Sequence, residues 1–197
     1  MEFRKALETR RSNYTLSNET VVSDDIVSAL IAHALEFTPS AYDARSQRVL
    51  LLFGESHLRL WKIVLEALRK IVPEASFPKT EKKIAGFSAG RGTVLFYDDS
   101  AVTDGLAKAN PLYARNFERW AVEQGGMLQS NVWVALADVG YGASLQHYGE
   151  LIEDAVKEAF AIPSTWRMSA QMPFGKILAP ARAKDPDKIH ERLLVKR

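Results

Sequence analysis

The chain contains no cysteine among its 197 residues. This absence excludes disulfide scaffolds, thiolate zinc sites, iron–sulfur clusters and a cysteine nucleophile. Long apolar runs are also missing, because the longest relevant run, at 49–53, is far shorter than the ~20 residues that a membrane-spanning helix needs. The first residues form a charged amphipathic segment and not a signal peptide. We therefore expect a cytoplasmic protein with no membrane partner.

The chain also has no large excess of positive or negative charge. The 26 Lys and Arg residues against 24 Asp and Glu residues give a formal net charge of +2. A protein whose main partner is a nucleic-acid backbone carries a larger positive excess, so we expect no nucleic-acid partner. The basic residues gather near the N-terminus, at 79–91 and in the C-terminal tail. These clusters either face water separately or converge on one small anion.

Hydrophobic periodicity predicts a single domain over residues 1–197 that mixes helices and strands. The 47% hydrophobic and 25% charged residues are average for a globular protein. Ser23 is a good N-cap, because Asp24 and Asp25 follow it in the first turn. Helices are expected at 2–11, from Ser23 to the break at 38–40, over 58–71 and at 150–160. Strands are expected at 49–53, 93–97, 143–145, 166–172 and 189–195.

The longest helical pattern covers residues 113–139. Two glycines in its middle, Gly125 and Gly126, predict two helices that meet there. The second of them is apolar nearly all round, which indicates burial in a core or in a subunit interface.

Residues 86–90 match the G-x-S-x-G pattern of hydrolase nucleophile elbows. An elbow needs a strand before the serine and a helix after it. Here charged residues precede Ser88 and the predicted strand follows it. A glycine-rich bend entering a strand is therefore the better interpretation than a serine hydrolase.

Other cofactor motifs are incomplete. The G-x-G pairs at 90–92 and 140–142 lack a third glycine and a downstream acid, and no G-K-[ST] occurs. A nicotinamide cofactor is therefore not held by a Rossmann unit. We expect no metal site, because the four histidines are dispersed without metal-ligand spacing: His33, His57, His147 and His190.

Arg10 and Arg11 precede Ser12 at the end of the first predicted helix. Guanidinium groups bind phosphate bidentately and a serine hydroxyl adds a neutral donor, which suits a phosphate monoester. Such runs are more often solvated charge on a surface. The residues alone leave both interpretations open.

Five motifs between residues 10 and 148 resemble, in order, the nitroreductase family. They are 10–12 (RRS), 39–42 (PSAY), 80–84 (TEKKI), 92–96 (GTVLF) and 142–148 (GASLQHY). The Leu-Gln-His-Tyr segment and the helix that contains Trp120 and Trp133 resemble a branch of short fungal and bacterial members associated with fatty-acid-repression mutants.

The resemblance implies an α+β nitroreductase-like fold, with a central mixed or antiparallel sheet flanked by helices and a long buried helix at the interface of a homodimer. FMN would lie at that interface, take hydride from NADH or NADPH and reduce small nitroaromatic or quinone acceptors. Nucleotide and acceptor would use the same face of the flavin in turn, which is a ping-pong mechanism. The flavin supplies the chemistry, so no catalytic side chain is implied.

The resemblance also implies the contacts of the flavin phosphate and ring. Arg10, Arg11 and Ser12 would bind the phosphate and the ribityl chain. Arg192, preferred over Lys188, would be the basic residue near a last strand that completes this site.

Along the ring, Lys83 would lie at the anionic N1–O2 edge of the reduced flavin; the alternative is an exposed lysine on a helix. Backbone groups of Leu145, Gln146 and His147 would reach N5 and O4. His147 is not expected to be a catalytic base.

A last set of contacts would reach the flavin from the partner subunit: Pro39, Ser40, Ala41 and Arg45. The family commonly has Asn and Gln where this chain has Asp43 and Arg45. An acid beside the flavin opposes its reduction and an arginine favours it, so a salt bridge between the two would offset their effects.

One alternative function from another class stays open. The family branch is associated with lipid-linked and stress regulation, which suggests a non-catalytic flavin-binding or regulatory protein. Reduction of the bound flavin by NADH or NADPH would distinguish an enzyme from such a protein.

Overall fold

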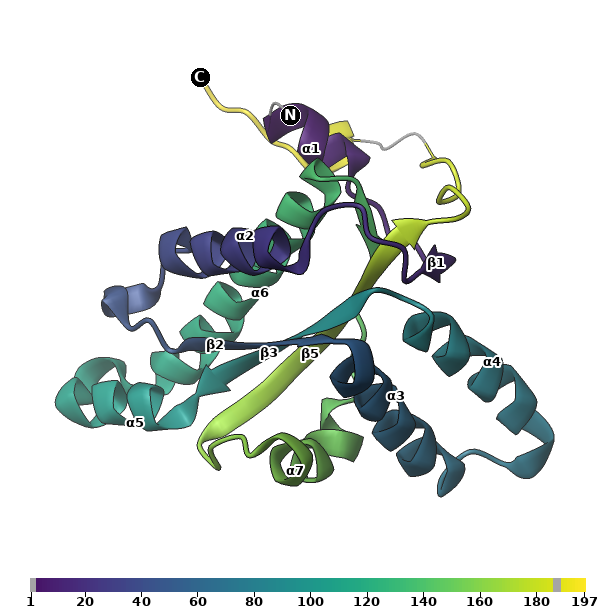
Figure 1. Ribbon diagram of the computed structural model, residues 1–197. Helices are drawn as coiled ribbons and strands as arrows, with labels where there is room; N and C mark the ends of the chain where they lie inside the picture. The colour runs from purple at the N-terminus through teal and green to yellow at the C-terminus, as the bar shows by residue number, and fades with distance from the viewer. Residues whose placement is uncertain (1–2, 186–188) are drawn as a thin grey trace.

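An antiparallel sheet with helices on both faces forms the protein (Figure 1), in a computed structural model that describes residues 3–185 and 189–197. The main path of the sheet runs β1–β5–β3–β2, and β4 pairs with β5 beside this path. Every strand pair is antiparallel, which confirms the expected α+β class. The strands are β1 (Leu16–Ser17), β2 (Gln47–Phe53), β3 (Gly92–Asp99), β4 (Tyr141–Ala143) and β5 (Trp166–Ile177).

The helices are in large part those that the periodicity predicts. Ser23 caps α2 as expected, since its hydroxyl accepts from the Ile26 amide at 3.3 Å. No helix within 3–185 and 189–197 is both long and apolar enough to cross a bilayer. The helices are α1 (Phe3–Thr9), α2 (Asp24–Phe37), α3 (Gly54–Arg69), α4 (Phe77–Ser88), α5 (Ser100–Ala109), α6 (Ala114–Asp138) and α7 (Gly149–Phe160).

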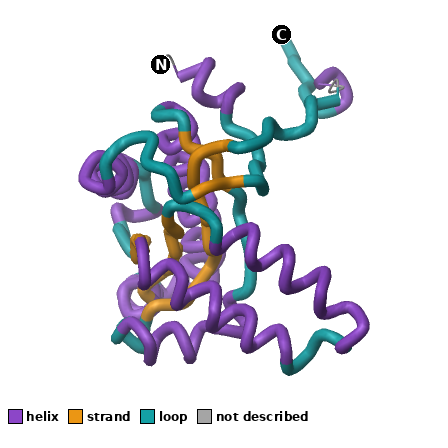
Figure 2. Tube along the Cα trace, turned by 45° about the vertical axis from the view of Figure 1, so that its right-hand side comes forward, coloured by secondary structure: helices purple, strands orange, loops and turns teal. Residues whose placement is uncertain are grey.

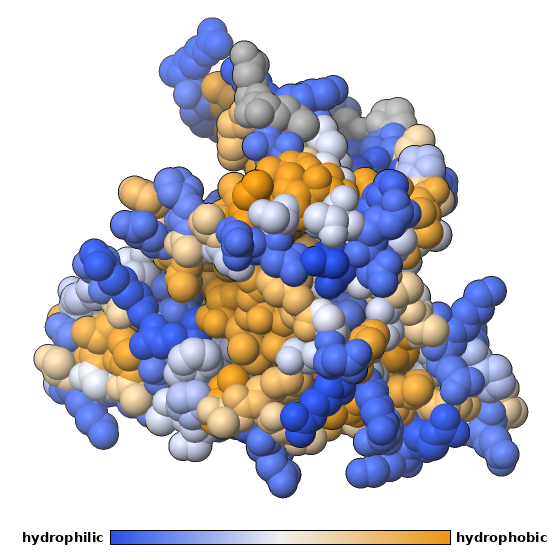
Figure 3. All heavy atoms as spheres, viewed as in Figure 1, coloured by the Kyte–Doolittle hydropathy of each residue, from blue (hydrophilic) through white to orange (hydrophobic). Residues whose placement is uncertain are grey.

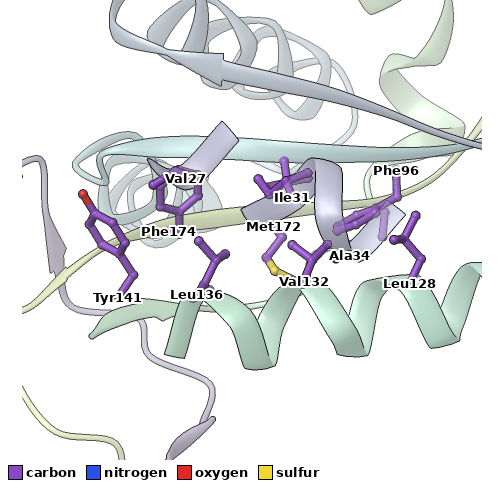
Figure 4. Close-up of a cluster of buried hydrophobic side chains, with 13 residues drawn as sticks. Val27, Ile31, Ala34, Phe96, Leu128, Val132, Leu136, Tyr141, Met172 and Phe174 are labelled. Atoms are coloured by element: carbon purple, nitrogen blue, oxygen red, sulfur yellow. The ribbon is translucent and has the colours of Figure 1, made fainter. Parts of the chain in front are cut away.

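Two hydrophobic clusters lie on opposite faces of the sheet. Successive side chains of a strand point to opposite faces, so Val94 and Phe96 of β3 join one cluster whereas Leu95 and Tyr97 join the other. The first cluster packs α2 and α6 against β3 and β5 (Figure 4). The second packs α3, α4 and α7 against the other face. Figure 2 shows the helices on the two sides of the strands.

The prediction of two helices over 113–139 is wrong, because α6 is one continuous helix through Gly125 and Gly126. Each glycine disfavours a helix by roughly 1 kcal/mol. That local preference is overridden by packing along the whole helix. The buried positions form one unbroken stripe at spacings of three and four: Phe117, Ala121, Gln124, Leu128, Val132 and Leu136.

The segment interpreted as a glycine-rich bend is helical over residues 86–88 and bends only at 89–90, before β3. It ends α4, whose buried Phe77, Ile84 and Phe87 share one face of the helix. Ser88 is the last helical residue, and β3 follows it. A helix before the serine and a strand after it are the reverse of a nucleophile elbow.

The strand predicted at 189–195 does not form. Ile189–Glu191 is a 3-10 turn, and Leu193 and Leu194 after it are exposed. A run of residues with β propensity forms a strand only where it can pair with the edge of a sheet and pack on an apolar surface. Within the described chain this tail does neither. The strand expected at 143–145 is β4, which lies slightly earlier, and Glu2 and Lys188 fall outside the described residues.

His57 lies in the second cluster and makes a fully paired polar network. Its Nε2 is 3.1 Å from the Ser88 carbonyl oxygen, which only accepts, so Nε2 carries the proton. Its Nδ1 therefore accepts from the Thr93 hydroxyl at 2.8 Å, and that hydroxyl accepts from Trp61 Nε1 at 3.0 Å. Burial lowers the pKa of His57, which keeps the ring neutral in the folded chain.

We expect this network to make stability depend on pH. An unfolded histidine takes up a proton near pH 6.5, whereas folded His57 does so only at a lower pH. The stability that neutral His57 contributes is thus present above about pH 6.5 and is lost as pH falls below it, by up to ~1.4 kcal/mol per pH unit. Urea unfolding at pH values between about 7.5 and 5.5 measures this loss.

Two variants isolate the effect. His57→Gln keeps a donor and an acceptor but does not titrate, so its free energy of unfolding should change less with pH than that of the wild type. His33→Gln, at an exposed position on α2, should keep the wild-type dependence. Equal pH dependence in the wild type and His57→Gln would contradict the prediction.

Candidate functional site

The segment that follows α1 lies along β4. Ser12 forms a parallel bridge with Ala143, and the Asn13 amide donates to the Ala143 carbonyl at 2.9 Å. Gly142 permits this approach, since a Cβ there would lie 2.9 Å from the Asn13 Cβ. The residues predicted to bind phosphate, 10–12, are thereby held beside the start of the segment predicted to follow the flavin ring.

Two arginines of this segment have distinct surroundings. The Arg10 guanidinium lies over the ring of Trp133 on α6, with its carbon 4.5 Å from the ring centroid. Arg11 Nη2 donates to the Arg182 carbonyl at 2.6 Å, which ties the C-terminal tail to this end of the molecule. Neither guanidinium pairs with a carboxylate of any described residue.

Lys83 reaches the same region from α4. Its Nζ lies 5.9 Å from the ring centroid of Tyr148 and 5.7 Å from that of Phe87. Helix α4 also approaches the segment after α1, since a Cβ on Gly86 would lie 3.6 Å from the Tyr14 carbonyl oxygen. Within the described ranges Lys83 has no acidic partner either.

Residues 144–147 pair with β5 along one side only. The Ser144 amide donates to the Pro173 carbonyl at 3.2 Å, and the Gln146 amide donates to the Gln171 carbonyl at 2.7 Å. The amides of Leu145 and His147 donate to no described residue. Because successive N–H groups of an extended chain point to opposite sides, these two form an open edge that faces away from β5.

Gln171 supports the segment after β4, and no sequence motif predicted this role. It is fully buried, and its Oε1 accepts from the Tyr148 amide at 2.7 Å. A glutamine within the apolar alternation of 166–172 is the signal that would have found it.

The predicted partner-side segment, 39–45, lies elsewhere, between α2 and β2 (Figure 1). Ser40 Oγ accepts from the Arg45 amide at 2.9 Å. The expected salt bridge is present, with Arg45 Nε 2.8 Å from Asp43 Oδ1. Tyr42 packs against Phe117 and Trp120 of α6, with centroid separations of 5.3 and 5.8 Å.

Helix α6 separates the two groups of residues. Its Gln124 accepts from the Ala41 amide, and its Trp133 contacts Arg10. These positions are nine residues apart, which at 1.5 Å per residue is about 14 Å along the helix axis. One chain therefore brings together residues 10–12, Lys83 and 145–147, and it keeps residues 39–45 away from Arg10.

Arg192 does not follow a strand, contrary to the basis on which it was chosen. It comes after the 3-10 turn at Ile189–Glu191 in the exposed tail. Figures 1 and 2 both place that tail at the same end of the molecule as α1. Its contact with a phosphate stays a prediction.

A cavity of about 870 Å³ lies between α5, α6 and the ends of β3 and β5, and His147 is among its lining residues. Asp98 also lines it and accepts from the Ser46 hydroxyl at 2.5 Å. Burial raises the pKa of Asp98, and the hydrogen bonds from Ser46 and Thr103 partly offset that rise. In the part of the chain that the structure describes, no three His, Asp or Glu side chains gather closely enough to hold a metal ion.

Comparison with known proteins finds relatives over nearly the whole chain. The model of the nitroreductase family matches residues 7–176. The chain is 33% identical to putative nitroreductase HBN1 of Saccharomyces cerevisiae over 184 residues, which cover 91% of this chain and 90% of the yeast protein. It is 30% identical to nitroreductase FRM2 of the same yeast, over 86% of this chain and 85% of that protein.

A solved structure agrees with these matches. Nitroreductase CinD from Lactococcus lactis in complex with nicotinic acid has a TM-score of 0.92 to this chain and 37% sequence identity, with 100% of both chains covered. CinD structures in complex with chloramphenicol and with 4-nitrophenol give a TM-score of 0.91 and 36% identity. This likeness confirms the expected nitroreductase-like fold.

Proposed function

The chain belongs to the nitroreductase family, and from that premise we propose that it is an FMN-dependent oxidoreductase that takes hydride from NADH or NADPH. The observation that carries the proposal is a group of cations that have no acidic partner among residues 3–185 and 189–197 and that lie beside an open edge of backbone amides. Cations of this kind suit an anionic ligand, and open amides suit the polar edge of a flat ring. In this proposal residues 1–197 form one FMN-binding domain, and the protein acts in the cytoplasm.

The residues after α1 fit the phosphate of FMN. Arg10 lies over the ring of Trp133 and pairs with no carboxylate of a described residue, so its N–H donors would be available to a phosphate dianion. Arg11 uses one terminal nitrogen on the tail and keeps its other donors. Ser12, fixed on Ala143, adds a neutral hydroxyl donor.

The residues beyond β4 fit the flavin ring. The amides of Leu145 and His147 would donate to N5 and O4, while Gln146 is held on β5 by its own backbone bonds. Lys83 would place a positive charge at the N1–O2 edge, where it stabilises the reduced, anionic ring. FMN, when bound, supplies the hydride transfer, and these residues position it.

A second copy of the chain would complete the site. The 39–45 segment lies too far along α6 to meet Arg10 of its own chain, so in the proposal it reaches the flavin of a partner in a homodimer. Exposed apolar side chains on α6, Val122 and Met127, support such an interface. Figure 3 shows further apolar surface in the middle of the face seen in Figure 1.

Flat aromatic molecules are the proposed acceptors. Two of the three CinD complexes contain nitroaromatic compounds, chloramphenicol and 4-nitrophenol. Nicotinamide and acceptor would occupy the same open face of the ring in turn, because the chain offers no Rossmann unit for the nucleotide. His147 is exposed at this edge and would contact the acceptor without acting as a base.

Removal of the Arg10 side chain should weaken FMN binding. Arg10→Ala loses a charge-assisted bond to the phosphate, worth ~1.5–3 kcal/mol, or about 10- to 150-fold in Kd. Fluorescence titration of FMN into the apoprotein measures the change. Arg4→Ala, at an exposed position on α1, should stay close to wild type. An unchanged Kd in Arg10→Ala would place the phosphate elsewhere.

Lys83 should raise the reduction potential of bound FMN. In Lys83→Gln the loss of one nearby positive charge should lower the two-electron midpoint potential by roughly 20–60 mV, because the reduced ring is then less stabilised. Spectroelectrochemical titration measures this potential. Lys82→Gln, one position earlier on α4, is the matched control and should leave it unchanged. Equal potentials in wild type and Lys83→Gln would make Lys83 a surface lysine without a role.

Stopped-flow absorbance tests the activity itself. The oxidised flavin of the wild type should bleach on mixing with NADH or NADPH and recover on addition of 4-nitrophenol or a quinone. As ping-pong requires, reduction should go to completion without acceptor, and the reduced protein, separated from the nucleotide, should be reoxidised by acceptor alone. A bound flavin that stays oxidised with both nucleotides would favour the non-catalytic flavin-binding protein instead.

A further inference from the structure

The segment from Thr38 to Ser46 has a strained backbone. Tyr42, Asp43 and Arg45 have φ values of 57°, 49° and 48°, in the left-handed region that non-glycine residues rarely adopt. Such strain persists only where the surroundings hold the chain in that shape. The 38–46 segment therefore depends on contacts that stabilise its strained shape.

Contacts within the segment lie in water and are weak. The Asp43–Arg45 salt bridge joins side chains that are 72% and 80% exposed. Exposed pairs of this kind contribute little to a conformation. Arg48 adds a bond to the Arg45 carbonyl at 2.7 Å, which is exposed as well. The strained shape needs support from a buried group.

Gln124 of α6 is that buried group. It is 2% exposed; its Oε1 accepts from the Ala41 amide at 3.2 Å and its Nε2 donates to Ser46 Oγ at 2.6 Å. The buried Ser46 hydroxyl in turn donates to Asp98 of β3. One amide side chain thus binds both sides of the strained turn and connects it to the sheet.

A second anchor lies on the same face of α6, two turns further along. Asn131 Nδ2 donates to Thr38 Oγ1 at 2.8 Å. The Thr38 hydroxyl donates to the Ala34 carbonyl at the end of α2. Since positions seven apart share one face of a helix, α6 holds the start of the segment and its turn from one direction.

Gln124 occupies a position where packing alone favours an apolar side chain. Its neighbours in the buried stripe, Ala121 and Leu128, are apolar. A buried amide is unfavourable unless its hydrogen bonds are made, and both bonds of Gln124 go to the 38–46 segment.

We propose that Gln124 is a positioning residue that holds the 38–46 segment in the shape with which it contacts the FMN of a partner subunit. This role rests on the proposed function, which assigns that contact to residues 39–45. Gln124 itself touches neither flavin nor acceptor.

Gln124→Leu tests the proposal, because it keeps the volume and removes both bonds. Hydrogen exchange measured by mass spectrometry on peptides covering Ala41 reports the shape of the segment without any flavin. FMN titration of the apoprotein reports the contact. We expect exchange at Ala41 to become about tenfold faster and the Kd for FMN to rise about tenfold. The matched control, Gln129→Leu on the same helix, bonds only Ser169 and should change neither by more than about twofold.

Each outcome of these measurements either supports or overturns the role of Gln124. Faster exchange with an unchanged Kd would overturn the proposal and leave the proposed function intact. Failure of the wild type itself to bind FMN would overturn both, and would be visible before any variant is made. If Gln124→Leu does not fold, Ser46→Ala replaces it, because it removes one of the two bonds of Gln124; we then expect smaller changes in the same direction, about threefold in each readout. No change in either readout would overturn the proposal.

Discussion

The packing of α6 against the sheet is the interaction on which the rest of the structure depends. Its buried Leu128, Val132 and Leu136 pack with α2 against β3 and β5, and the helix continues for 25 residues through two adjacent glycines. Two parts of the candidate site contact this helix directly. Trp133, near the C-terminal end of α6, contacts the Arg10 guanidinium. Gln124, near the middle of the helix, accepts a hydrogen bond from the Ala41 amide.

In our proposal, the helix that lies between the two groups of flavin-binding residues has a consequence for assembly. The cations and open amides near β4 suit a flavin, but the 38–46 segment is fixed about 14 Å further along the axis. Buried hydrogen bonds hold that segment in a strained backbone shape, as expected of a surface that is preformed for contact with a partner. In our proposal one half of a flavin site lies near Trp133 and half of another lies near Gln124, and two copies of the chain complete both sites.

Local signals in the sequence predicted the elements whose stability is local. The cap at Ser23, the apolar runs of β2 and β3 and the alternation of β5 all appear as expected. The break at Gly125 and the strand at 189–195 were wrong, because their outcome depends on distant partners that no local pattern encodes. The same holds for Gln124, whose partner Ala41 is 83 positions away. The family resemblance predicted Arg10, Lys83 and His147 as flavin contacts. It did not predict the side chains that support this region, Trp133 and Gln171, because each contacts a residue far from it in the sequence.

A mixed-subunit titration tests most directly whether two copies share each flavin site. Arg10→Ala and Gln124→Leu chains, each weak in FMN binding alone, are refolded together in equal amounts and titrated with FMN. In a mixed dimer one site receives both defects and the other receives none, so with random pairing about a quarter of all sites should regain the wild-type Kd. A titration equal to the average of the two separate variants would show that one chain forms the whole site, and would contradict the account.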